Sequence, residues 1–228
     1  MKSTKSKILA IIAVVAIVCA GVIFFPKINI PESAAQDKST KVATSTKKVE
    51  EKKDTTKKST DPNAKYRPYA DPKDLAKEGS WKVKSEKKAH PNLKKVKDLW
   101  IRVSLKGNRT YIMSGNKPIY TMLSTGGIYK NGKSATPTGT YYVQPERGAE
   151  FFNQELNEGA RYYVSWKDHG IYLFHSVPTK ANKKINVKEA NKLGKTQGSH
   201  GCVRLSLPDA KWLCYNLPIG TKVVIKDE

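Results

Sequence analysis

Residues 8–25 form an unbroken run of 18 residues without a charged or strongly polar side chain. At a rise of about 1.5 Å per residue, a helix of this length just spans the hydrocarbon core of a bilayer. Three lysines precede the run and only Lys27 follows it closely, so the positive-inside rule places residues 1–7 in the cytoplasm. The run exceeds the roughly 7–15 apolar residues of an ordinary signal peptide, which favours an uncleaved anchor over a cleaved leader. We therefore predict a single-pass cell-membrane protein whose remaining chain is extracytoplasmic.

The segment after the anchor, residues 26–97, has the composition of a linker. Lys, Ser, Thr, Glu and Ala dominate residues 32–60, which contain no Leu, Ile, Met or aromatic residue. Such a stretch cannot bury enough apolar surface to offset the entropy lost on ordering, so we predict a disordered tether there. Residues 61–97 contain several prolines and aromatic residues, and we expect them to be loosely structured.

The chain is strongly basic, with 42 Lys and Arg against 20 Asp and Glu and a formal net charge of +22. It contains no arginine cluster, zinc finger or RNP-like aromatic motif, so we expect no nucleic-acid partner. Outside a membrane, the nearer polyanions are lipid head groups and wall polymers, which attract a basic surface electrostatically. A solvated lysine-rich surface without a specific partner explains the charge almost as well.

From residue 98 onward the pattern changes to short strand-like segments separated by turns, and we assign residues 98–228 to one domain. Gly107-Asn108 and Gly115-Asn116 are turn sequences between such segments. Asp168-His169-Gly170 is another, which favours a hairpin role for His169 over a catalytic one. The predicted strands are 99–105, 109–113, 119–123, 140–143, 162–166, 171–174 and 222–225.

Two short helices complete the predicted mainly β domain. Asn186 with Glu189 three residues later resembles a capping box, and Gly194 ends that segment. Ser206 can cap a second helix, on which Ala210, Leu213, Cys214 and Leu217 share an apolar face. Cys214 is therefore predicted to be a small core residue. About 130 residues bury roughly two-thirds of their unfolded surface, which suffices for one core.

The segment Ser199-His200-Gly201-Cys202-Val203-Arg204 carries the candidate chemistry. Three cysteines are too few for a disulfide framework, and no Cys/His cluster indicates a metal site. A nucleophilic cysteine needs a stabilised thiolate and a base. Adjacent side chains on an extended segment point to opposite faces, so His200 is poorly placed to deprotonate Cys202, and His175 at a strand end is the better base. A loop thiol and a buried strand-end histidine remain the alternative interpretation.

The chain resembles the L,D-transpeptidase (YkuD-type) catalytic domain over roughly residues 98–228. The resemblance rests on His175-Ser176, on the Ser-His-Gly-Cys-Val-Arg segment, and on the upstream Ser124-Thr125-Gly126-Gly127 and Thr136-Pro137-Thr138-Gly139-Thr140. It implies a β-sandwich with the cysteine in a groove, here preceded by the membrane helix and the disordered tether. The residues from Lys180 to Lys195 form an excursion that lengthens the spacing between the two halves of the motif.

The resemblance implies a role for each motif residue. Cys202 matches the nucleophile and His175 the general base. Ser176 matches the residue whose backbone carbonyl orients the imidazole. The backbone amides of Gly201 and Cys202, with His200, match the oxyanion hole.

Arg204 and Ser199 are expected to bind substrate, although a structural role for the arginine stays open. The implied reaction begins when Cys202 attacks the carbonyl between residues three and four of a peptidoglycan tetrapeptide stem and releases terminal D-Ala. An acceptor amine then resolves the thioester into a 3→3 cross-link. The reaction needs no metal or organic cofactor and serves cell-wall biogenesis and cell shape. Carbapenem β-lactams are expected to be covalent inhibitors.

Three alternatives stay open at this point. Water as the acceptor makes the same site an L,D-carboxypeptidase. A sortase is also membrane-anchored and uses Cys, His and Arg, but its cysteine follows a Thr-Leu-x-Thr type strand, whereas Cys202 follows Ser-His-Gly. A non-catalytic wall-binding protein explains the anchor and the charge but not the Cys/His pair.

Overall fold

The computed structural model describes residues 61–228. The predicted cytoplasmic segment, the membrane helix over residues 8–25 and the tether over 26–60 lie outside this range. Among residues 61–228, no helix is long and apolar enough to cross a membrane. The membrane anchor therefore stays a prediction.

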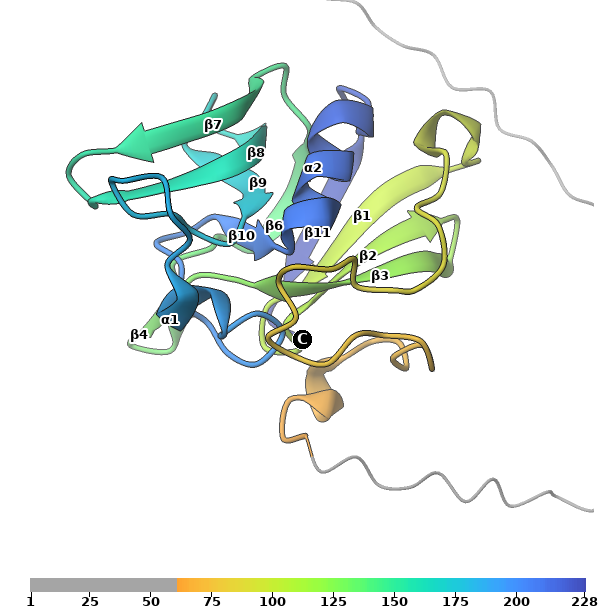
Figure 1. The fold of residues 1–228 in the computed structure, drawn as a ribbon. Coiled ribbons are helices and arrows are strands. Elements are labelled where there is room, and N and C mark those ends of the chain that lie inside the picture. The colour runs from red at the N-terminus through yellow and green to blue at the C-terminus, as the bar shows by residue number, and fades with distance from the viewer. Residues whose placement is uncertain (1–60) are drawn as a thin grey trace, which may run out of the picture. The chain divides into compact units, whose positions relative to one another are not determined.

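The described chain is built mainly from strands, with two α-helices and two single-turn 3-10 helices (Figure 1). The strands are β1 (Leu99–Ser104), β2 (Arg109–Ser114), β3 (Lys117–Thr125), β4 (Tyr129–Lys130), β5 (Lys133–Ser134), β6 (Gly139–Tyr142), β7 (Arg147–Asn153), β8 (Glu158–Lys167), β9 (Tyr172–Ser176), β10 (Val203–Leu205) and β11 (Lys222–Lys226). The helices are η1 (Ala64–Tyr66), η2 (Leu93–Lys95), α1 (Val187–Ala190) and α2 (Leu207–Asn216).

Nine strands form one sheet in the order β6-β11-β1-β2-β3-β10-β9-β8-β7, and β4 pairs with β5. The sheet curls, so that the chain just after β6 returns to β8, where the Gln144 N–H donates to the Ser165 carbonyl at 2.8 Å. The two halves enclose one core, which contains Ile101 of β1 together with Trp166 and Phe174. The predicted mainly β architecture with two short helices is confirmed. The two facing layers of the predicted β-sandwich belong to one continuous curled sheet.

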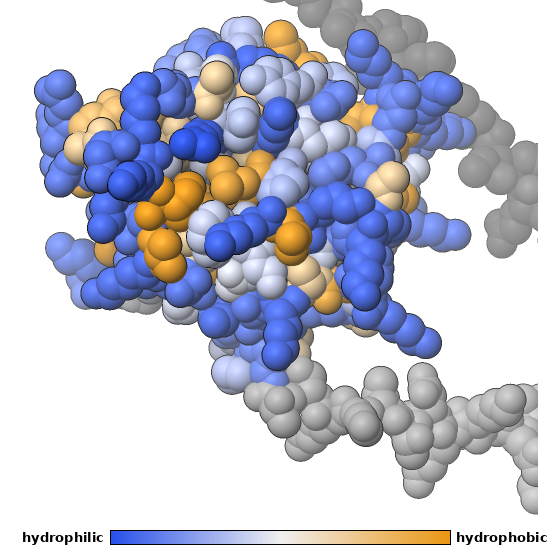
Figure 2. Space-filling view, viewed as in Figure 1, coloured by the Kyte–Doolittle hydropathy of each residue, from blue (hydrophilic) through white to orange (hydrophobic). Residues whose placement is uncertain are grey.

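The turns that the sequence predicts between β1, β2 and β3 are present. Asn108 has a φ of 54° and Gly115 a φ of 55°. Asn and Gly tolerate this left-handed conformation best, which explains their occurrence at these two turns. The face of the domain drawn in Figure 2 is mostly hydrophilic, with apolar side chains exposed in small areas.

Strands β7 and β10, and the two-residue strands β4 and β5, were not predicted from the sequence. β7 is mostly exposed and shows no apolar alternation in Arg-Gly-Ala-Glu-Phe-Phe-Asn. β10 is only three residues long, which is too short for a periodic pattern, yet all three are buried. It lies between β3 and β9, parallel to β9. This short strand therefore places the segment that contains Cys202 beside the strand that contains His175.

Both predicted helices have the predicted caps. The Asn186 side chain accepts a hydrogen bond from the Glu189 N–H, and the Ser206 side chain accepts one from the Asp209 N–H. α2 packs inside the curl of the sheet against β8 and β9 (Figure 1). Its Cys214 is 1% exposed, as expected for a core residue.

Residues 61–97, here called the strap, are packed onto the domain, whereas the sequence analysis assigned them to the linker. Arg109 of β2 is 2% exposed, and it donates to Asp71 of the strap from Nε at 3.0 Å and from Nη2 at 2.7 Å. Its Nη1 also donates to the Gly194 carbonyl at 3.0 Å. Arg67 of the strap binds the same carboxylate at 2.9 Å. A buried arginine needs such carboxylate partners, so the strap completes the domain.

The second half of the strap is anchored on α2. The carboxylate of Asp209 is fully buried and accepts hydrogen bonds from the Ser85 N–H at 3.1 Å and from the Tyr120 hydroxyl at 3.1 Å. His90 lies 2.8 Å from the same carboxylate and stacks on Trp212, with ring centroids 4.4 Å apart. The sequence alone did not indicate these contacts because strap and helix are more than a hundred residues apart.

Candidate active site

The motif residues meet in a cavity of about 360 Å³ at the end of β9 and the loop before β10. Cys202 and His175 line it together with Ser199, His200 and Gly201. The parallel pairing of β9 with β10 brings these two parts of the sequence together, because Val203 lies opposite Phe174. The structure thus brings together the predicted nucleophile and the predicted base.

The imidazole of His175 is buried and held in one orientation. Its Nδ1 lies 2.6 Å from the carbonyl oxygen of Ser176. A carbonyl only accepts hydrogen bonds, so Nδ1 carries the proton and Nε2 is left as the basic nitrogen. The ring of Phe151 packs edge-on against the imidazole, with centroids 5.4 Å apart. The orienting role predicted for the Ser176 carbonyl agrees with this geometry.

Burial and, to a smaller extent, the nearby Arg204 cation lower the pKa of His175 to about 3, against an upward contribution from the Ser176 carbonyl. The imidazole is therefore neutral at neutral pH. A neutral imidazole with a free Nε2 can accept a proton, as a general base requires.

The thiol of Cys202 is half-buried at the edge of the cavity, and its Sγ lies 3.6 Å from the Ile171 carbonyl oxygen. Desolvation raises the pKa of this thiol to about 11, although a backbone hydrogen bond from Leu173 and the charge of Arg204 act in the opposite direction. The resting site therefore pairs a neutral thiol with a neutral imidazole. Such a thiol becomes nucleophilic only when a base removes its proton.

The loop before Cys202 is fixed by its own hydrogen bonds. The Ser199 hydroxyl donates to the Cys202 carbonyl at 2.5 Å and accepts from the Gly201 N–H at 3.1 Å. Ser199 is 2% exposed, so its side chain shapes the loop, whereas the sequence analysis expected it to bind substrate. The Gly201 N–H is likewise already used, which differs from its expected role as an oxyanion donor.

Gly201 has a φ of +146°, and a Cβ at this position would meet a Tyr172 ring carbon at 2.9 Å. The close approach explains why this position requires glycine. The Gly201 carbonyl accepts a hydrogen bond from the Thr136 hydroxyl at 2.8 Å, and that hydroxyl accepts one from the Gly127 N–H at 2.8 Å. Thr136, which the sequence analysis noted only as part of a motif, thus connects the Gly126-Gly127 segment to the loop of Cys202.

Arg204 is 1% exposed and does not line the cavity. Its Nη2 donates to both carboxylate oxygens of Glu158, at 2.7 and 2.8 Å, and its Nη1 donates to Glu189 at 3.0 Å. The expected substrate-binding role of Arg204 therefore does not fit this structure. Its partners could not be identified from sequence, because they lie on β8 and α1. Arg204 acts through its charge on His175 and through the ion pairs that hold β10 to these elements.

The two remaining histidines of the sequence prediction lie at the surface. His200 is exposed at the rim of the cavity. His169 has a φ of 43° in the turn before β9, and its Nδ1 lies 2.8 Å from Glu146. It does not line the cavity, which agrees with its interpretation as a hairpin residue. Within residues 61–228, no three His, Cys, Asp or Glu side chains are arranged to hold a metal ion.

The fold and the cavity define a mainly β domain with a Cys/His site. The family model of the YkuD L,D-transpeptidase catalytic domain matches residues 98–225, and the chain belongs to this family. The candidate L,D-transpeptidase YciB of Bacillus subtilis (strain 168) is 51% identical over 136 residues, which cover 60% of this chain and 69% of that protein. The family prediction made from the motif is confirmed.

The matches to similar solved structures cover a smaller share of those chains than the match to YciB covers of that protein. A fused zinc-dependent amidase/peptidase with a peptidoglycan-binding domain, from Clostridium acetobutylicum ATCC 824, is 32% identical with a TM-score of 0.42. The match covers 57% of this chain and 52% of that one. L,D-transpeptidase 3 from Mycobacterium tuberculosis, solved with a faropenem-derived adduct, is 21% identical with a TM-score of 0.42, covering 57% of this chain and 60% of that one. The chain thus spans little more than half the length of these structures.

Proposed function

We propose that this protein is a peptidoglycan L,D-transpeptidase that forms 3→3 cross-links through a thioester on Cys202. The observation that carries this proposal is the shared cavity of Cys202 and His175, in which the Ser176 carbonyl holds Nδ1–H and leaves Nε2 basic. Membership of the L,D-transpeptidase family supplies the reaction class.

The first half-reaction forms the acyl-enzyme. His175 Nε2 takes the thiol proton as Sγ attacks the carbonyl between residues three and four of a tetrapeptide stem. The carbonyl π electrons move to oxygen, and backbone N–H groups such as that of Cys202 are the proposed donors to this oxyanion. When the intermediate collapses, the C–N bond breaks and the imidazolium gives its proton to the amine of the departing D-Ala.

The second half-reaction transfers the acyl group. An amine of an acceptor stem loses a proton to His175 Nε2 and attacks the thioester carbonyl. The C–S bond breaks, the thiolate of Cys202 recovers a proton from the imidazolium, and a new amide joins the two stems. With water in place of the amine, the same steps release a tripeptide, which is the L,D-carboxypeptidase reaction.

We further propose that residues 8–25 hold this domain at the outer face of the cell membrane, next to its polymer substrate. The basic surface supports retention at anionic wall polymers and lipid head groups. Carbapenems are proposed covalent inhibitors, because the Cys202 thiol can open a strained β-lactam as it attacks a peptide carbonyl. The product is again a thioester.

Incubation of the full-length protein with a defined tetrapeptide muropeptide, followed by mass spectrometry, tests the proposal. We expect cross-linked dimers with loss of one D-Ala, and a separate incubation with a carbapenem should give a covalent adduct on Cys202. Cys202→Ala should abolish both, whereas the matched Cys214→Ala should retain both. Tripeptide without dimers would favour the carboxypeptidase. Full activity of folded Cys202→Ala protein would refute the assignment of the nucleophile.

A further inference from the structure

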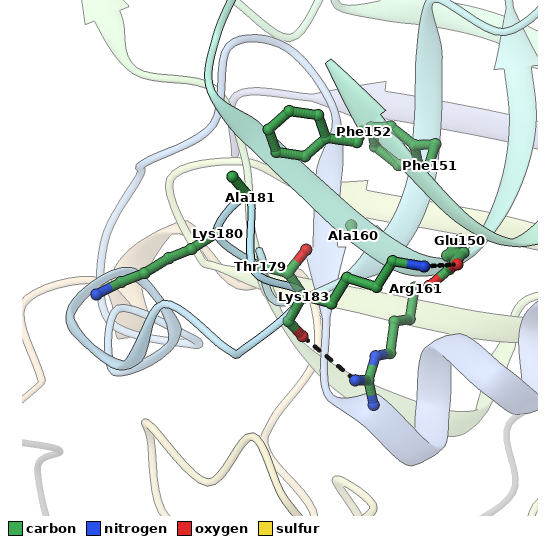
Figure 3. Close-up of a pocket in the computed structure, with 9 residues that line it drawn as sticks. All are labelled: Glu150, Phe151, Phe152, Ala160, Arg161, Thr179, Lys180, Ala181 and Lys183. Carbon is green, nitrogen blue, oxygen red and sulfur yellow. Dashed lines mark hydrogen bonds and ion pairs between the residues drawn. The ribbon is translucent and has the colours of Figure 1, made fainter. Parts of the chain in front are cut away.

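A second cavity, of about 240 Å³ (Figure 3), shares part of its lining with the catalytic one. We call it the β7–β8 cavity. Strands β7 and β8 form one side and the turn after Thr179 the other, through Glu150, Arg161 and Lys183. The turn is closed by two hydrogen bonds of 2.9 Å, between Lys180 N–H and the Lys184 carbonyl and between Lys183 N–H and the Lys180 carbonyl.

The two cavities share a wall. Phe151 and Phe152 of β7 line both of them. Phe151 also contacts the imidazole of His175, and Phe152 is 43% exposed. A molecule lying across these two rings therefore reaches from the reacting groups into the β7–β8 cavity, over an apolar surface.

The β7–β8 cavity has an excess of positive charge at one end. Lys183 Nζ lies 2.6 Å from Glu150 Oε1, so the charges of these two side chains offset each other. This ion pair also lowers the pKa of the Glu150 carboxyl group. Arg161 donates from Nη2 to the Lys183 carbonyl at 3.3 Å but forms no ion pair with any residue of 61–228. In Figure 3 the guanidinium of Arg161 lies beside Lys183, whereas the side chain of Lys180 extends away from them. Among the residues described, Arg161 and Lys180 are thus the two cations of this cavity without an ion pair, and Arg161 is the one beside Lys183, where its charge also acts on Glu150.

We propose that the β7–β8 cavity binds a free carboxylate of the peptide substrate, with the Arg161 guanidinium as its partner and Phe152 as the apolar surface beside it. This inference rests on the proposed function, because it names the peptide that reaches Cys202 as the ligand. A planar guanidinium with unused N–H groups matches a carboxylate geometrically. The shared phenylalanine wall favours a peptide continuous with the one being cleaved over a separate phosphate polymer.

Isothermal titration of full-length Cys202→Ser protein tests the proposal without turnover. The ligands are a tetrapeptide muropeptide and forms of it in which each free carboxylate in turn is an amide. We expect amidation of one carboxylate to weaken binding about tenfold, the size of one charge-assisted hydrogen bond. Adding Arg161→Gln should remove this difference. Adding Lys180→Gln, which deletes a cation from the same turn, should preserve it.

The outcomes separate the two proposals. Equal affinity for every form of the peptide, or equal effects of Arg161→Gln and Lys180→Gln, would overturn the carboxylate site. The carboxylate site would also be overturned if polyphosphate bound in an Arg161-dependent manner while amidation of the peptide did not weaken its binding. The wild-type protein is assayed for turnover in parallel. Absence of turnover with the Arg161-dependent preference intact would count against the proposed reaction and not against the site.

Discussion

The buried neutral imidazole of His175 predicts a specific dependence of stability on pH. Its pKa in the folded protein is about 3, against about 6.5 for an unperturbed histidine. As the pH falls below about 6.5, the unfolded chain binds a proton at this position and the folded protein does not. The stability that the neutral ring provides is therefore complete above that pH and is lost progressively as the pH falls towards 3.

The size of the effect follows from the gap between the two pKa values. Each pH unit below about 6.5 costs about 1.4 kcal/mol for one group that only the unfolded state protonates. At pH 5 the loss is therefore about 2 kcal/mol. His175 is only 3% exposed, so solvent screening does not reduce this value strongly.

The wild-type and His175→Asn proteins are unfolded in urea at pH 8, 7, 6 and 5, and unfolding is monitored by tryptophan fluorescence. Asparagine retains a donor for the Ser176 carbonyl but no group that titrates. We expect the free energy of unfolding of the wild type to fall by about 2 kcal/mol more than that of the variant between pH 8 and 5. Cys214→Ala, which lowers stability without removing an acid-range group, should parallel the wild type. Equal slopes for wild type and His175→Asn would refute the burial argument.

Three further predictions concern the site and the strap. The rate of acylation by an uncharged probe, measured by stopped flow, should vary little between about pH 5 and 9, because the pKa values of His175 and Cys202 are about 3 and 11. Arg204→Met should raise the pKa of His175 and so shift the loss of rate in acid to higher pH. A wild-type rate that is half-maximal near pH 7 would contradict this prediction. Leu93→Ala, which truncates a buried strap residue, should cost about 2–4 kcal/mol in denaturant unfolding, and a change below about 0.5 kcal/mol would show that the strap is dispensable. Thr136→Val should lower stability by about 1–3 kcal/mol, because it leaves the buried Gly127 N–H unpaired, and should slow carbapenem acylation; acylation at the wild-type rate would show that this bridge does not position the loop.

Several parts of the fold were predictable because their causes are local. A positive φ at Asn108, a side-chain cap from Asn186 or Ser206, and apolar spacing along α2 all involve residues within a few positions of each other. The family signature around Cys202 is local in the same sense. These features identified the β-rich domain, both helices and the candidate nucleophile.

The strap was not predictable because its order comes from distant partners. Asp71 is stabilised by Arg109, and His90 by Asp209 and Trp212, and none of these pairs is visible in local composition. Many prolines and lysines are typical of a linker, yet specific long-range contacts outweigh that composition. Local propensity is a weak guide where tertiary contacts supply the free energy.

The sequence by itself indicated the candidate catalytic residues, whereas the tertiary structure decided which partners each of them has. The candidates are Cys202 and His175, because few other side chains of this chain can act as nucleophile and base. Only the structure showed that Arg204 is committed to Glu158 and Glu189 and that the Gly201 N–H is already bonded. The physical reason is that hydrogen-bond partners and desolvation depend on which strands become neighbours. Here a three-residue strand, β10, sets that arrangement by pairing with β9.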